Sequence, residues 1–241
     1  MSSQSFKFIV LNTLKHSDSG IVVQGYSDCG GRESFYLKCN GKNRAVKLSL
    51  LHPLNIIEIN LSSRSFGSLR TIKDYSPVYI LKSIRGDVRK SAIALFMGEL
   101  VLRTIKEIEP NPPMFRFLEN AIVTLEQLSE GVSNYHLSFI LFFCGQLGYS
   151  PDLSGHNNGR YFDIPAARFT DNCSNPSLVL GEQESTLLRK LGSAGLFAAT
   201  QIKADRNLRF NYLSGMIKYL TFHTGHEISV ESLGVLHEVF E

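Results

Sequence analysis

The period at which apolar residues recur changes near Gly86, and this change constrains the fold more than any other feature of the sequence. Before it, apolar and polar residues alternate in short runs separated by turn residues, which is typical of strands with one buried face. After it, apolar residues recur every three or four positions, which is typical of amphipathic helices. The sequence therefore predicts an α+β protein whose strands come first.

Five short runs before residue 82 favour β-strands. The clearest is 34–39, where Phe35 and Leu37 alternate with Tyr36 and Lys38. The runs cover residues 6–14, 21–26, 34–39, 57–61 and 69–80. Five antiparallel strands of this length predict a small barrel, because closure removes exposed strand edges.

Helical periodicity follows and continues to the end of the sequence. Apolar residues from Ile93 to Ile108 recur at spacings of three and four, Asp87 is available as a cap, and Pro110 ends the run. Further helices are predicted over residues 112–128, 133–147, 182–191, 205–222 and 230–241. We expect residues 1–82 to form the barrel domain and 83–241 an all-α helical domain with a long loop near 149–177.

Charge is divided unevenly along the chain. Residues 1–90 carry 14 Lys and Arg against 6 Asp and Glu, a net charge of +8, whereas residues 91–241 carry 11 against 16, a net charge of −5. A basic segment joined to a mildly acidic one indicates that the first part contacts a polyanion and the second does not.

Common catalytic and nucleotide-binding motifs are absent from the sequence. Gly41-Lys42 is followed by Asn43, which lacks the hydroxyl that a phosphate-binding loop needs. The four cysteines are scattered and form no metal-binding or redox pair. The longest apolar stretch, 137–147, is too short to span a membrane. We therefore expect a cytoplasmic protein without membrane association that is not an enzyme and needs no cofactor.

His223, His226 and Glu227 come nearest to a metal-ligand cluster. Gly225 is expected to end a helix between the two histidines, so they need not share a face. The simpler interpretation is a helix C-terminus with histidines near the negative end of its dipole. We predict no metal site, and a metal-dependent enzyme built on these residues ranks last among our hypotheses.

Basic residues of the barrel form the main candidate site. Tyr36 lies beside Lys38, and an aromatic ring can stack on a base while cations follow the phosphates. The alternative is a solvated strand edge that Lys and Arg protect against aggregation. A second basic group, where strands meet helices, extends the path. The predicted DNA-binding residues are Arg32, Tyr36, Lys38, Lys42, Arg44, Lys47, Arg85, Arg89 and Lys90.

A set of short stretches, spread over nearly the whole chain, carries a family resemblance through its order and intervals. The stretches are Ile9–Leu11 with His16–Ser19, Arg89–Phe96, Glu107–Pro112, Asn134–Leu137, Leu147–Tyr149 with Pro151, Tyr161–Asp163 and Ser232–Phe240. Together they resemble RecO, the bacterial family of recombination and repair mediators, in the form found in Bacteroidetes.

The resemblance implies an N-terminal OB-fold that binds single- and double-stranded DNA, followed by a helical domain. Such proteins are not enzymes: with RecR they displace single-strand-binding protein, help to load RecA onto DNA gaps, and anneal complementary strands. The implied partners are DNA, RecR, the acidic tail of single-strand-binding protein and, indirectly, RecA, at the nucleoid during repair. The family's basic segment after its third strand corresponds here to Lys38, Asn40, Gly41, Lys42 and Arg44.

The sequence departs from this family in one segment. Many relatives carry a four-cysteine zinc site after the Leu-Gly-Tyr stretch, whereas residues 150–180 contain only Cys173, so we expect no zinc. Packing by Tyr161, Phe162 and Phe169 is expected to hold the segment against the helices instead.

The helical part supplies cations that suit an acidic tail. These are Arg116, Arg189, Lys190, Lys203, Arg206, Arg209 and Lys218. An alternative hypothesis is a protein-interaction scaffold, in which an OB-like barrel binds a peptide or subunit and the basic strands serve only solubility. That hypothesis predicts salt-insensitive binding to a protein and no binding to DNA.

Overall fold

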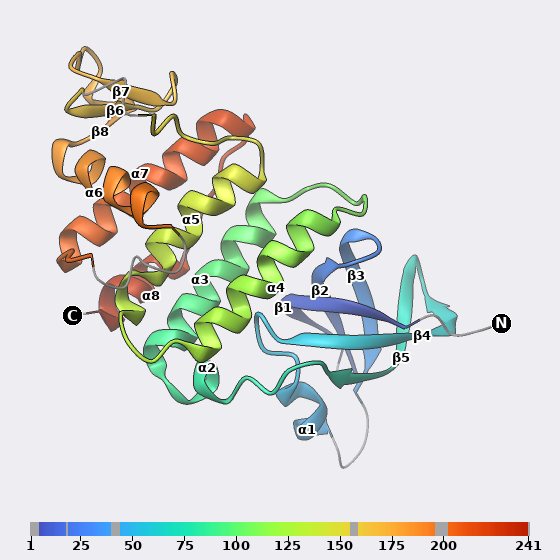
Figure 1. Ribbon diagram of the computed structural model, residues 1–241. Helices are drawn as coiled ribbons and strands as arrows, with labels where there is room; N and C mark the ends of the chain where they lie inside the picture. The colour runs from blue at the N-terminus through green and yellow to red at the C-terminus, as the bar shows by residue number, and fades with distance from the viewer. Residues whose placement is uncertain (1–4, 18, 40–43, 155–158, 196–201, 241) are drawn as a thin grey trace. The chain divides into compact units, whose positions relative to one another are not determined.

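Five strands, with the short helix α1 among them, precede the longer helices in the computed structural model, which describes residues 5–17, 19–39, 44–154, 159–195 and 202–240 (Figure 1). The elements are β1 (Phe6–Ser17), β2 (Gly20–Ser27), β3 (Gly31–Lys38), α1 (Arg44–Ser49), β4 (Ile56–Phe66), β5 (Leu69–Pro77), α2 (Lys82–Gly86), α3 (Val88–Thr104), α4 (Pro112–Gln127), the 3-10 turn η1 (Val132–Asn134), α5 (Tyr135–Gln146), β6 (Tyr161–Asp163), β7 (Arg168–Thr170), the 3-10 turn η2 (Pro176–Leu178), β8 (Val179–Leu180), α6 (Glu182–Ala194), α7 (Arg206–Thr224) and α8 (Ser232–Val239). The predicted α+β class is confirmed.

Two compact units share the chain. One comprises residues 1–86 and 98–126, and the other comprises residues 87–97 and 127–241. The first unit therefore contains helical residues from α3 and α4 as well as the strands. A domain boundary at residue 82 stays a prediction.

The first five strands close into a barrel in the order β1–β2–β3–β5–β4. Four of the neighbouring pairs are antiparallel, but β3 and β5 run parallel, with Tyr36 opposite Thr71. The predicted five-stranded barrel is confirmed, while the prediction that it is wholly antiparallel is wrong. Strand direction cannot alternate all the way around a closed ring with an odd number of strands, so one pair has to be parallel.

Inward-facing side chains fill the barrel. They are Phe8, Val10, Ile21, Val23, Phe35, Leu37, Cys39, Leu51, Ile57, Ile59 and Ile72. Leu48 of α1 packs against this cluster, although the sequence pattern predicted no helix between the third and fourth strands. A helix this short leaves no periodic signal, and burial of its apolar residue against the barrel accounts for its formation.

Carboxylates of α4 bind the barrel and the short helix α2. Glu119 accepts a hydrogen bond from Lys7 Nζ of β1 at 2.8 Å, and this bond raises the pKa of the lysine. Glu126 accepts hydrogen bonds from the backbone N–H groups of Ser83 and Ile84, both at 2.8 Å. These interactions explain why α4 belongs to the same compact unit as the strands.

The predicted helices after residue 86 are present, with boundaries shifted by a few residues. Asp87 caps α3 as expected, since its Oδ1 accepts the N–H of Arg89 at 2.8 Å. Within the described ranges, no helix combines the length and hydropathy that crossing a lipid bilayer requires.

A small three-stranded sheet in the order β7–β6–β8 lies in and just after the segment predicted to be a long loop. Phe162 and Phe169 are buried in it, and the backbone N–H of Phe162 donates to Ser185 Oγ of α6 at 2.8 Å. Tyr161 is only half-buried. Two of the three aromatic residues expected to anchor the segment therefore form its core, and the ring centroid of Phe162 lies 5.7 Å from that of Tyr219 on α7.

Candidate nucleic-acid interface

Side chains of β3 alternate between the barrel interior and its outer surface. Phe35 and Leu37 point inward, while Lys38 is exposed on the outer side with Tyr36. The alternation on which the candidate site depends is therefore present. Tyr36 pairs with Thr71 of β5, and the exposed Lys38 and Lys73 each follow two residues after a member of this pair.

Tyr36 does not present its ring to solvent. Its side chain is only 7% exposed, because the ring of Phe66 is stacked on it with centroids 4.2 Å apart and planes 13° from parallel. His16 of β1 meets both rings edge-on, with centroid distances of 6.0 Å to Tyr36 and 5.4 Å to Phe66. We call Tyr36, Phe66 and His16 the aromatic cluster.

Phe66 is the member of the aromatic cluster that faces water, with 47% of its surface exposed. It is the last residue of β4, directly before the hairpin turn at Gly67. Phe66 was not among the residues predicted from the sequence, although a large aromatic residue among Ser65, Gly67 and Ser68 at a hairpin tip is itself unusual. The exposed surface of this ring is available for contact with a ligand.

Gly20 provides the space in which the ring of Tyr36 lies. It pairs with Lys38 across β2 and β3, and a Cβ atom at this position would overlap the hydroxyl end of the Tyr36 ring. The absent side chain thus lets Tyr36 lie flat along the outer surface, where it supports Phe66.

Exposed cations border the aromatic cluster. Lys38 and Lys73 lie on β3 and β5, and Arg64 precedes Phe66 by two residues on β4. Arg64 lies in the stretch between Leu61 and Ser65, where the pairing of β4 with β5 shifts register, and its side chain is exposed. Cations beside an exposed aromatic ring are the combination that suits single-stranded nucleic acid.

Arg32 has a structural role. Its backbone N–H donates to Glu107 O at 3.1 Å, and its guanidinium Nη1 donates to Ile105 O at 3.0 Å. The preceding Gly31 has a φ of +66°, and a Cβ there would overlap the carbonyl oxygen of Glu109. The β2–β3 turn is therefore anchored to the segment that follows α3, and Arg32 is half-buried in this anchor.

Three predicted cations follow β3. Lys42 lies outside the described residues. Arg44 and Lys47 belong to α1, and their backbone is described but their side chains are not. Arg85, by contrast, is exposed on α2 and donates a hydrogen bond to Ser49 O at the end of α1. Burial, with a further contribution from Arg85, lowers the pKa of His52.

Arg89 and Lys90 belong to the second compact unit. Arg89 is exposed and pairs with Asp87 at 2.8 Å, and this hydrogen bond is the main cause that lowers the pKa of the aspartate to about 2. Lys90 is only 2% exposed. Its ammonium group is therefore not displayed to a ligand in this conformation.

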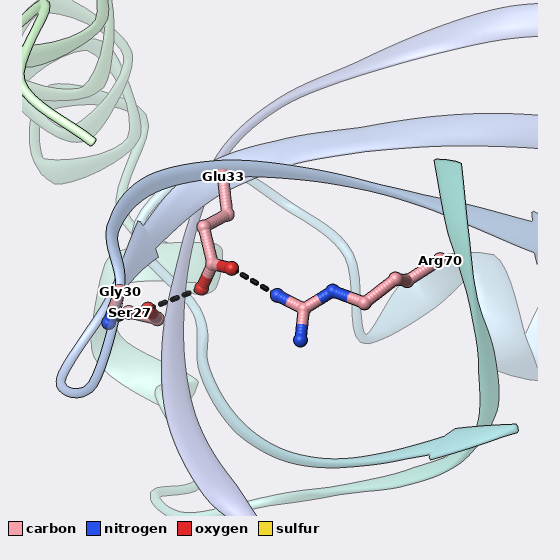
Figure 2. A network of polar contacts seen from close by, with 4 residues as sticks. All are labelled: Ser27, Gly30, Glu33 and Arg70. Atoms are coloured by element: carbon pink, nitrogen blue, oxygen red, sulfur yellow. Dashed lines mark hydrogen bonds and ion pairs between the residues drawn. The ribbon is translucent and has the colours of Figure 1, made fainter. Parts of the chain in front are cut away.

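Figure 2 shows a polar network between β2, β3 and β5 in which Glu33 is central. Glu33 accepts hydrogen bonds from Ser27 Oγ at 2.5 Å and from Arg70 Nη2, and Ser27 Oγ accepts the backbone N–H of Gly30 at 2.8 Å. The Arg70 guanidinium lies 5.1 Å from the ring centroid of Phe35, in the barrel core. Arg70 is thus held by Glu33, which distinguishes it from Lys38 and Lys73 on the outer surface.

His223, one of the three residues considered as metal ligands, contacts a backbone carbonyl and two tyrosine rings instead. Its Nε2 lies 2.8 Å from Ile164 O, at hydrogen-bond distance, and its ring contacts Tyr149 and Tyr219. Gly225 ends α7 with a φ of +72°, as expected. Among the described residues, no three potential metal ligands lie close enough to hold an ion.

Several cations of the helical part are already engaged by backbone carbonyls. Arg189 donates to Gly159 O, Arg206 to His237 O at 2.8 Å, and Arg209 to Ala204 O at 2.6 Å. Lys190 and Lys203 instead line an open pocket of about 600 Å³ between α6 and the start of α7, which also contains Glu182 and Glu184.

A closed five-stranded barrel of this strand order, with an exposed basic and aromatic outer face and helices after it, defines an OB-type barrel protein with an associated helical part. The family profile described as "Recombination protein O C terminal" matches residues 85–230. "DNA repair protein RecO" of Bacteroides fragilis is 32% identical over 237 residues, covering 97% of both chains. The same-named protein of Phocaeicola vulgatus is 30% identical over 236 residues, covering 96% of this chain and 97% of that one. That of Flavobacterium johnsoniae is 28% identical over 243 residues, covering 97% and 98%.

The chain belongs to the RecO family of DNA repair and recombination proteins. This confirms the resemblance noted from the sequence.

Proposed function

We propose that the protein is a recombination mediator that binds single- and double-stranded DNA on the outer face of its barrel and anneals complementary strands. With RecR, it helps to load RecA onto DNA coated by single-strand-binding protein, at the nucleoid in the cytoplasm. The observation that carries the proposal is the exposed Lys38 beside the aromatic cluster, with Lys73 and Arg64 around it. Membership of the RecO family supports the same function.

The proposed mechanism is electrostatic and consumes no nucleotide. Each Lys or Arg that neutralises a phosphate releases counterions, so affinity falls steeply as salt rises and depends little on base sequence. Lys38, Arg44 and Lys47 bind phosphates in this way. They hold two DNA strands weakly enough for the strands to rearrange. Pairing between complementary bases then supplies the driving force for annealing, and no side chain acts as a nucleophile, acid or base.

Partner binding falls to the helical part in this proposal. The pocket lined by Lys190 and Lys203 suits the acidic tail of single-strand-binding protein better than Arg206 and Arg209 do, because those two arginines already donate to backbone carbonyls. Glu182 and Glu184 in the same pocket oppose an anionic ligand, so the tail has to approach on the lysine side.

Fluorescence anisotropy with a labelled single-stranded oligonucleotide, repeated at several salt concentrations, tests the proposal. We expect binding whose logarithmic affinity falls linearly with the logarithm of the salt concentration, and annealing of two complementary oligonucleotides without ATP. Absence of DNA binding by folded protein would reject the proposal and favour the scaffold hypothesis, in which the barrel binds a protein.

A further inference from the structure

We infer that Phe66 is a base-stacking residue, and that it makes the barrel prefer unpaired bases to duplex DNA. This inference rests on the proposed function and adds to it the residue that distinguishes single from double strands. It comes from the relation between Phe66 and Tyr36, of which only Phe66 is exposed.

One face of the Phe66 ring is occupied and the other is available. Tyr36 lies parallel to the first face at 4.2 Å between centroids, and His16 meets the ring edge-on at 83°. These two neighbours fix the plane of the ring, so a base that stacks on its outer face finds the ring already oriented. With 47% of its surface exposed, the Phe66 ring keeps an aromatic surface accessible to a base.

The surrounding charges identify the occupant. Lys38 is exposed and pairs with Gly20 at the end of the Tyr36 ring, and Lys73 and Arg64 are exposed on the neighbouring strands β5 and β4, so an apolar peptide would leave these charges unmatched. A strand of nucleic acid satisfies both features, because its phosphates meet the cations while a base meets the ring. Aromatic stacking accepts any base, which agrees with binding that does not depend on sequence.

Duplex DNA cannot use Phe66 in this way. Its bases are already stacked and paired, and only phosphates and groove edges are presented to the protein. Duplex therefore binds the cations alone. When two strands anneal on the barrel, the bases leave Phe66 for each other, and the product is bound less tightly than the separate strands.

Phe66→Ala tests this inference, with binding measured by anisotropy for an oligonucleotide and for its duplex. We expect single-strand affinity to fall roughly 5- to 150-fold, the range that alanine substitution of a stacking residue produces. Duplex affinity should stay within about twofold, and the salt dependence should not change, because the substitution removes no charge. Phe222→Ala is the matched control, since Phe222 is 49% exposed on α7 and lies in the other compact unit.

Phe66→Leu is a second variant, which tests the inference even if Phe66→Ala fails to fold. Leucine keeps an apolar side chain on Tyr36 but has no aromatic face, so thermal unfolding should match the wild type while single-strand affinity falls. Unchanged single-strand affinity in either folded variant would overturn the inference, as would an equal loss for duplex.

Phe66→Trp gives a direct spectroscopic signal, because the natural sequence contains no tryptophan. We expect single-stranded oligonucleotide to quench the emission of this single tryptophan, duplex to leave it unchanged, and addition of the complementary strand to restore it. Unquenched emission from a variant that still binds single strands would reject stacking at Phe66 and leave the proposed function intact. Failure of the wild-type protein to bind any DNA would instead reject the proposed function itself.

Discussion

Arg70 of β5 donates a hydrogen bond to the carboxylate of Glu33 on β3, and so joins the two strands whose pairing closes the barrel (Figure 2). This closing pair is parallel, with a single register position at Tyr36 and Thr71. The side chains of Glu33 and Arg70 are 15% and 54% exposed, so water weakens the pair only in part. Polar side chains thus supplement a short backbone ladder.

Glu33→Ala should lower the free energy of unfolding by about 1–3 kcal/mol, because it removes the acceptor of both Ser27 and Arg70. Arg70→Ala should cost less, about 1 kcal/mol or below, since most of its side chain is in water. Urea unfolding followed by circular dichroism measures both. Glu130→Ala, at an exposed position, is the control, and an equal effect there would contradict a role for Glu33 in closure.

Lys38→Ala combined with Arg44→Ala should weaken binding to single-stranded and duplex DNA alike. The slope of log affinity against log salt should become shallower by about one unit for each phosphate that the variant no longer neutralises. Anisotropy titrations over a series of salt concentrations provide the slopes. Arg168→Ala combined with Lys218→Ala, which removes two exposed cations on β7 and α7, serves as the charge-matched control. A folded double variant with unchanged affinity and slope would move the DNA-binding face elsewhere.

Gly20→Ala should impair single-strand binding without touching a charge. Its methyl group would overlap the end of the Tyr36 ring, so the ring has to shift and Phe66 loses its support. We expect single-strand affinity to fall severalfold and stability to fall by about 1–3 kcal/mol. Gly234→Ala on α8, where the added Cβ meets open space, is the control for the substitution itself. Wild-type affinity in Gly20→Ala would show that Phe66 does not depend on Tyr36.

His136 should make stability depend on pH. Burial, reinforced by the nearby charge of Arg209, lowers its pKa to about 3, and its Nδ1 has no hydrogen-bond partner among the described residues. The unfolded chain, with a histidine pKa of about 6.5, therefore binds the proton more readily. Stability is full above a pH of about 6.5 and falls below it by at most about 1.4 kcal/mol per pH unit, down towards a pH of about 3.

His136→Leu should lack this pH dependence, because leucine does not titrate. Urea unfolding at a series of pH values from about 7.5 to about 5 measures the difference in unfolding free energy between the two proteins. That difference should shift in favour of the variant as the pH falls below about 6.5. Parallel profiles over this range would mean that His136 is protonated as easily in the folded protein as in the unfolded chain.

Local pattern in the sequence predicted the elements and the direction of the β3 side chains. Alternation told which residues point out, but it carried no information on what covers them. Tyr36 is buried by Phe66, which comes thirty positions later in the chain and reaches it only once the barrel has closed. The exposed aromatic residue could have been suspected only from its unusual place at a polar hairpin tip.

For charged residues too, local sequence pattern does not show which groups the side chain contacts in the folded protein, with one exception. Nothing near Arg32 in sequence indicates that it binds Ile105 O, because the hydrogen bond joins positions far apart in the chain. Lys90, however, precedes the buried Ile93 and Ala94 by three and four positions. Helical period alone places it on the buried face of α3, so this part of the predicted site could have been corrected from the sequence.

The anchor at Gly31 and Arg32 determines which fragments of the chain keep the contacts of the β2–β3 turn. A fragment that stops at residue 82 would lack the carbonyl oxygens of Ile105 and Glu107, against which the β2–β3 turn is held. It would also lack Glu119, the partner of Lys7. A fragment of residues 1–82 is therefore expected to be less stable than one that extends through α4 and keeps these contacts.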